Sequence, residues 1–128
     1  TPLHLAGAAD CAGVRDWVRF HCASPLVSAE EAQFALGRWT DLQPVGRFAM
    51  GLPDYPDRSV TLIVEMAELL AEGAVLRGPG IEREARLSLP DVAAFQDNLA
   101  RYPLGFDCFF TCAARLAALP RSTHVEAR

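Results

Sequence analysis

Residues 59–67 read SVTLIVEMA, a nearly continuous apolar run that decides the fold class. Valine, isoleucine and threonine favour extended backbone. An apolar run of this length without strict alternation is typical of a strand that is covered on both faces. We therefore predict that this segment lies inside a sheet, with other elements packed against it on either side.

Shorter apolar segments before and after this run are predicted to supply the neighbouring strands. Glycine and proline separate several of them, as in the turn at residues 78–80. Two segments flank residues 113–114 and are predicted to form a hairpin. Residues 39–57 show no sustained period, and residues 51–57 read as a loop. The predicted strands are residues 3–6, 33–36, 59–67, 74–77, 85–89, 106–112 and 115–119.

A first helix is predicted from Asp10, a good N-cap residue, to about Cys22. Pro25 prevents its continuation beyond residue 24, because the residue before a proline is pushed out of the helical region. One further helical turn is predicted at residues 28–31. The buried face of the first helix is predicted from the i, i+3, i+4, i+7 spacing of Val14, Trp17, Val18 and His21.

A second helix is predicted to begin near Pro90, a favourable first-turn residue, and to end before Pro103. Strands interleaved with helices predict an α/β architecture, with a mixed sheet and helices on both faces. The inner stripe of the second helix is predicted to be Val92, Phe95, Leu99 and Tyr102.

Composition restricts the function classes. With 128 residues, of which 51% are hydrophobic and 22% charged, the chain is predicted to fold as one domain, residues 1–128. A net charge of −4 disfavours binding to nucleic acid or to an acidic membrane. No apolar run approaches the roughly 20 residues that span a bilayer, and no leader pattern opens the sequence, so a cytoplasmic protein is expected.

The residue types present also restrict the chemistry. The chain contains no lysine, and all 12 of its basic residues are arginine. A Schiff base with pyridoxal phosphate and a Walker-type phosphate loop both need a lysine, so neither is expected. We expect no cofactor and no metal in this chain.

The four cysteines, Cys11, Cys22, Cys108 and Cys112, are predicted to be reduced, buried thiols. An iron–sulfur cluster needs three or four thiolates at one place. Cys108 and Cys112 are predicted to lie on one face of one strand, with no third cysteine near them in the sequence. A metal site from His21, Cys22 and His124 would need them to converge in space, and a structural histidine is favoured for His21.

Three stretches carry a resemblance to a known family. They are residues 19–27 (RFHCASPLV), residues 76–81 (LRGPGI), and residues 102–126, which begin YPLGFD and end LPRSTHVE. In order and spacing they resemble PhnH, a subunit of the bacterial carbon–phosphorus lyase machinery. The ending PRSTHVE is the most specific of these pieces. Members of the family carry a further N-terminal segment of several dozen residues, which is not found in this sequence.

The resemblance implies a role in organophosphonate breakdown. The family joins the PhnG, PhnI and PhnJ subunits in a core complex that replaces the adenine of ATP with a phosphonate, giving a ribose 1-phosphonate 5-triphosphate. A later radical step cleaves the carbon–phosphorus bond. The resemblance further implies a homodimer and a fold similar to the large domain of pyridoxal-phosphate-dependent transferases, without their cofactor. It brings no catalytic residue to this chain.

Arg121, Ser122, Thr123 and His124 are the candidate site residues. A guanidinium, two hydroxyls and an imidazole could hold a phosphate or phosphonate, or bind a partner subunit. Alternatively, Arg121 pairs with an acidic neighbour, and the two hydroxyls cap a turn.

The predicted function is that of a non-catalytic structural subunit of the complex. The alternative is direct nucleotide or phosphonate binding, for which we expect a basic pocket lined by Arg77, Arg115 or Arg121.

Overall fold

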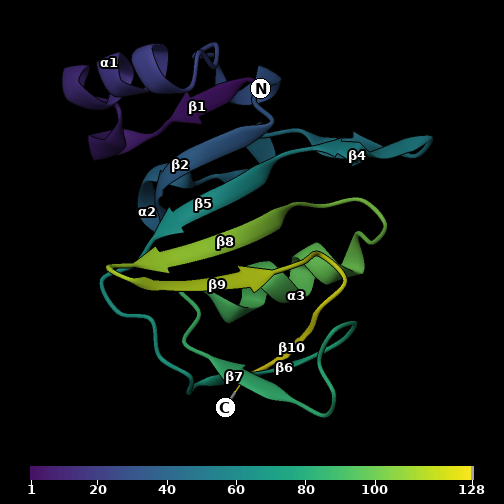
Figure 1. Cartoon of the computed structure of the whole chain (residues 1–128). Coiled ribbons are helices and arrows are strands. Elements are labelled where there is room, and N and C mark those ends of the chain that lie inside the picture. Colours follow the sequence, from purple (N-terminus) through teal and green to yellow (C-terminus); the bar gives the residue numbers. More distant parts are fainter. Residues whose placement is uncertain (128) are drawn as a thin grey trace.

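A five-stranded mixed sheet forms the centre of the computed structural model, which describes residues 1–127 (Figure 1). The strand order is β1-β2-β5-β8-β9. The strands β1, β2, β5 and β8 are parallel to one another, and β9 is antiparallel to β8. The predicted mixed α/β sheet is therefore confirmed. The strands are β1 (Leu3–Leu5), β2 (Phe34–Arg38), β5 (Thr61–Glu65), β8 (Asp107–Cys112) and β9 (Arg115–Leu119).

Strand β5 occupies the middle of this sheet, as the apolar run predicts. Val60, Leu62 and Val64 are completely buried. Leu62 lies opposite Ala35 of β2 on one side and Cys108 of β8 on the other. The predicted hairpin of β8 and β9 is also confirmed, and Ala113 adopts a positive φ of 51° in its turn.

The main core lies on one face of the sheet, beneath helices α2 (Trp39–Leu42) and α3 (Val92–Ala100). The ring of Phe95 stacks on Trp39 at 5.2 Å and meets Phe110 of β8 edge-on at 5.7 Å. Asp91 caps α3 by accepting a hydrogen bond from the backbone N–H of Ala94. Phe95 therefore lies in the predicted stripe, whereas Tyr102 does not, because its side chain is exposed.

The opposite face of the sheet is not fully covered. Phe109 and Leu116 are exposed, and they alternate with the buried Phe110 and the half-buried Ala117. Figure 1 shows α1 (Ala12–His21) beside β1, at the edge of the sheet farthest from β9. The expectation of cover on both faces is therefore wrong for β8 and β9. Apolar residues in a strand predict that the strand is covered, but the sequence does not indicate whether the same chain or a partner covers it.

Helix α1 departs from its prediction in two ways. Its N-cap residue is Cys11, while the Asp10 carboxylate pairs with Arg15 instead of capping the helix. Of the predicted buried face only Val18 is buried, whereas Trp17 is 58% exposed and His21 is exposed. The helix is weakly packed, as it lies beside the edge strand β1 and not over the centre of the sheet (Figure 1).

Two smaller sheets complete the fold. A three-stranded antiparallel sheet has the order β10-β6-β7, built from β10 (His124–Glu126), β6 (Ala74–Arg77) and β7 (Ala85–Leu87). A hairpin pairs β3 (Met50–Leu52) with β4 (Tyr55–Ser59), so the predicted loop at residues 51–57 is wrong. The sequence did not indicate β4 because it contains Pro56, and proline within a strand is confined to edge strands, strand starts and bulges.

Short 3₁₀ turns connect these elements. They are η1 (Gly7–Ala9), η2 (Ala29–Glu31) and η3 (Val45–Arg47), and η2 is the helical turn predicted at residues 28–31. Within residues 1–127, no helix has the length and apolar character needed to cross a bilayer.

Candidate functional site

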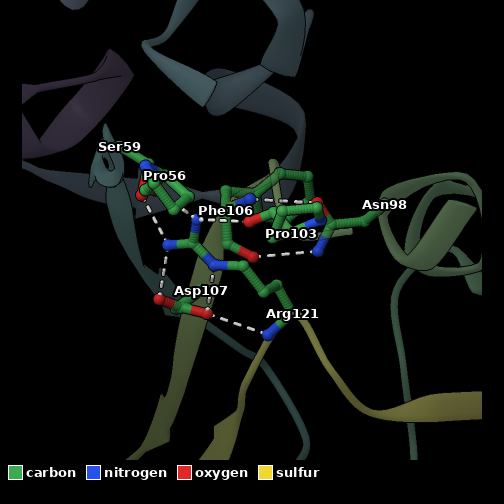
Figure 2. Close-up of polar contacts among 7 residues, drawn as sticks. All are labelled: Pro56, Ser59, Asn98, Pro103, Phe106, Asp107 and Arg121. Atoms are coloured by element: carbon green, nitrogen blue, oxygen red, sulfur yellow. Dashed lines mark hydrogen bonds and ion pairs between the residues drawn. The ribbon is translucent and has the colours of Figure 1, made fainter. Parts of the chain in front are cut away.

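Arg121, the central residue of the predicted site, forms a fork with Asp107 at the start of β8 (Figure 2). Its backbone N–H donates to Asp107 Oδ1 at 2.8 Å, and its Nε donates to the same oxygen at 3.1 Å. Its Nη2 donates to Asp107 Oδ2 at 2.8 Å. The chain turn after β9 is thereby fastened to the beginning of β8. Paired bonds of this kind are the strongest hydrogen bonds that proteins make.

The remaining guanidinium donors of Arg121 bind the β4 hairpin and a neighbouring loop. Nη1 donates to the carbonyl of Pro56 at 2.8 Å and to that of Pro103 at 3.5 Å, and Nη2 donates to the Ser59 hydroxyl. The side chain of Arg121 is only 13% exposed. The guanidinium donors of Arg121 are therefore bonded to the chain itself. The pairing with Asp107 agrees with the alternative in which Arg121 pairs with an acidic neighbour.

The charge of Asp107 is stabilised by this arrangement. Partial burial opposes ionisation, but the side-chain and backbone hydrogen bonds from Arg121, together with its positive charge, hold the pKa of Asp107 below its ordinary value. Asp107 is therefore ionised in the neutral range and suits an ion pair better than proton transfer.

Asn98 reinforces the same region and was missed by sequence reasoning. This buried side chain donates from Nδ2 to the carbonyl of Phe106 at 2.8 Å and accepts from the N–H of Phe106 at 2.9 Å (Figure 2). Gly105 has a φ of 131°, and a Cβ there would lie 2.4 Å from Asn98 Oδ1. The side-chain amide of Asn98 thus provides hydrogen-bond partners for the backbone N–H and carbonyl of Phe106, just before β8 begins. The sequence signal that was available is Gly105, because the close approach of the Asn98 amide leaves no room for a side chain there.

Of the other three predicted site residues, Ser122 lines one cavity together with Arg121, whereas Thr123 and His124 do not line it. Thr123 is buried, and its N–H donates to the carbonyl of Pro120 at 3.1 Å. Ser122 is half-buried, and its carbonyl lies close to Gly78. His124 is exposed on β10, opposite Arg77. The four residues therefore connect β9 to β10, and Arg121 and Ser122 share one cavity there. Their role in binding a partner or a ligand stays a prediction.

The cysteines divide into two classes. Cys108 is buried on β8, and both burial and the nearby Asp107 charge raise the pKa of its thiol. Cys112 is half-buried on the same face of that strand, as predicted. Cys11 and Cys22 are exposed, so the prediction of burial is wrong for them. Across residues 1–127, no three cysteine, histidine or carboxylate side chains gather as metal ligands.

Comparison with known proteins shows the family of this chain. The family model described as bacterial phosphonate metabolism protein (PhnH) matches residues 1–126. The chain belongs to the PhnH family. A curated relative from Rhizobium meliloti (strain 1021), named alpha-D-ribose 1-methylphosphonate 5-triphosphate synthase subunit PhnH, is 36% identical over 137 residues. That match covers 98% of this chain and 67% of the relative.

Two cavities of this PhnH-family chain have linings that do not favour polyphosphates. One of about 350 Å³ lies beside Arg121 and is walled by Pro56, Pro103 and Pro120. Another, of about 570 Å³, is lined by Glu30, Glu31 and Asp57, with Arg58 as its one basic residue. Carboxylates repel phosphate groups, and Arg58 stacks on Tyr55 at 3.9 Å.

Exposed apolar residues are the more distinctive surface feature of this PhnH-family chain. Trp17 and the 85%-exposed Phe20 project from α1, where both rings contact His21. Leu116, 67% exposed, and Phe109 lie on the open face of the sheet. Aromatic side chains are enriched at protein interfaces, so neighbouring exposed aromatic residues are candidates for an interaction surface.

Proposed function

We propose that the chain is a non-catalytic structural subunit of the carbon–phosphorus lyase core complex, required for organophosphonate breakdown. Membership of the PhnH family supports this assignment, and so does the name of the curated relative, which describes a subunit of a synthase. The observation that carries the structural part is the exposure of Trp17 and Phe20 on a helix that is only weakly packed.

Exposed aromatic side chains favour an interaction function on energetic grounds. Burying one large apolar side chain stabilises a contact by about 1.5–3 kcal/mol. Tryptophan is also enriched among the residues that contribute most to protein interfaces. Trp17 and Phe20 are three residues apart on α1, and the His21 ring contacts both of them. A partner helix or loop seated there would complete the cover that α1 lacks.

The occupied state of Arg121 argues in the same direction. A ligand would have to displace Asp107 and two backbone carbonyls to reach its guanidinium. Arg77 is likewise held in ion pairs with Glu84 and Glu126. Of the three arginines expected in a ligand pocket, Arg115 alone lines a groove without an ion pair to another described residue.

We further propose the finer features that the family resemblance implies. The partners are PhnG, PhnI and PhnJ, the chain forms a homodimer, and the complex works in the cytoplasm. The likeness to the large domain of pyridoxal-phosphate-dependent transferases would then concern the fold alone, because a covalent aldimine needs a lysine that this sequence does not contain.

Calorimetric titration with ATP and methylphosphonate, paired with co-purification, tests the proposal. The chain is expected to co-purify with the three partner subunits and to give no binding heat with either ligand. Saturable heat from the isolated chain would favour direct ligand binding, especially if Arg115→Gln abolished the heat while assembly survived.

A further inference from the structure

A groove runs between residues 67–71 and the β8–β9 hairpin. It consists of two adjoining cavities of about 310 and 390 Å³, which share Leu69, Leu70 and Arg115 among their lining residues. In Figure 1 the chain leaving β5 passes the turn of this hairpin and continues towards β7. The shared lining makes the groove elongated, and Leu69 forms a buried part of its floor.

Two arginines line the first cavity, Arg115 from β9 and Arg86 from β7. Arg115 donates from Nη1 to the carbonyl of Leu69 at 2.8 Å, which fixes the guanidinium at the groove and leaves its other donors available. Neither arginine forms an ion pair with a residue among those described, whereas the neighbouring Arg77 pairs with two glutamates.

Apolar and acidic residues complete the lining. Leu70 and the exposed Leu116 lie in the same cavity as both arginines. Glu68 lines the second cavity, at the other part of the groove. Arginine is enriched at protein interfaces, where carboxylates of a partner meet the guanidinium and apolar side chains are buried beside it.

We propose that this groove binds an extended segment of a partner protein that carries a carboxylate side chain next to an apolar one. The proposal rests on the subunit function proposed above. Each cavity is at the lower end of the volume range of small-molecule sites, and two in line suit a chain better than a compact ligand. Glu68 repels a second carboxylate, so the acidic residue of the segment is directed to Arg86 and Arg115.

A nitrogen-15 NMR titration of the whole chain tests the proposal with defined probes. The first probe is the capped peptide acetyl-Glu-Leu-Gly-Leu-amide, and the second is its uncharged counterpart with glutamine in place of glutamate. The acidic peptide is expected to shift the amide resonances of residues 67–71 and 115–117 at millimolar concentrations. The glutamine peptide is expected to bind at least about fivefold more weakly, because it lacks the charge-assisted bonds.

Variants of the arginines provide the control. Arg86→Gln changes an exposed side chain and is expected to reduce acidic-peptide binding, as is Arg115→Gln. Arg83→Gln is the matched control, because Arg83 is exposed nearby and does not line the groove. Equal binding of both peptides, or groove resonances that do not move, would overturn the proposal.

A third probe, ATP, separates a peptide site from a general anion site. Tighter binding of ATP than of the acidic peptide at the same resonances would overturn the peptide assignment in favour of a small-anion site. If the peptide fills the groove but the chain fails to co-purify with the subunits, the proposed function fails and the groove assignment stands. If the chain assembles but the peptide does not bind, the reverse holds.

Discussion

Replacement of Arg121 by alanine is expected to destabilise the fold severely. The substitution removes the guanidinium bonds to Asp107, Pro56, Pro103 and Ser59. Breaking a buried ion pair from one side costs about 3–5 kcal/mol. Because the Asp107 side chain is 37% exposed, water can replace part of the lost interaction. The expected loss is therefore about 2–4 kcal/mol.

The measurement is urea unfolding followed by tryptophan fluorescence, since Trp39 packs on Phe95 in the core. At about 4 °C per kcal/mol for a domain of this size, Tm is expected to fall by roughly 8–16 °C. Arg121→Lys keeps the charge but loses the paired bonds to Asp107, so its stability is expected to lie between that of wild type and that of Arg121→Ala. Arg101→Ala, at an exposed position, is the control and should change stability by less than about 0.5 kcal/mol. A stable Arg121→Ala variant that fails to assemble or to bind ligand would refute the structural role of Arg121.

Three further outcomes are expected. Asn98→Ala should cost about 2–4 kcal/mol in urea unfolding, because it leaves a buried backbone N–H and carbonyl unpaired, and Asn98→Asp should not restore the lost donor. The native pKa of Asp107 is lowered, so its stabilisation is present above the unfolded pKa of about 3.9 and is lost as the pH falls through the native pKa. The stability of the wild type should therefore fall more steeply with decreasing pH than that of Asp107→Asn. Equal slopes of stability against pH would contradict the ion pair. Alkylation of the native protein, followed by mass spectrometry, should modify Cys11 and Cys22 rapidly and Cys108 only on unfolding.

The strands of the central sheet were predictable because each is a short apolar segment bounded by turn residues. The run at residues 59–67 correctly indicated the central strand β5, and the spacing around Ala113 correctly indicated the β8–β9 hairpin. The β3–β4 hairpin was not predictable in this way. Strand β4 contains Pro56 and three exposed residues, so it has neither the period nor the composition of a buried strand.

The burial of α1 was overestimated for a physical reason. A helix face made of Val14, Trp17 and His21 has the same spacing whether it packs against its own core or against another protein. Periodicity identifies an apolar face, but it cannot identify the surface that covers it. Exposure of Trp17 is thus information that only the structure supplies.

The geometry around Arg121 was not predictable from the sequence. An acidic partner for Arg121 was among the alternatives, but Asp107 is 14 residues away and Ser59 is 62 residues away. Contacts at such separations depend on strand order, which local patterns do not determine. Asn98 was missed because a polar residue on a predicted helix is usually exposed.

The central claim is that the chain works through exposed surfaces that bind partner subunits. Its most direct test is the affinity of the isolated chain for a purified PhnG–PhnI–PhnJ assembly, compared with that of a Trp17→Ser, Phe20→Ser double variant. Asp16→Ser, on the same helix, serves as the control. Loss of one interface hot spot costs about 2 kcal/mol, so the double variant is predicted to bind about 30-fold more weakly or worse, with unchanged Tm. Equal affinity of wild type and double variant would contradict the claim.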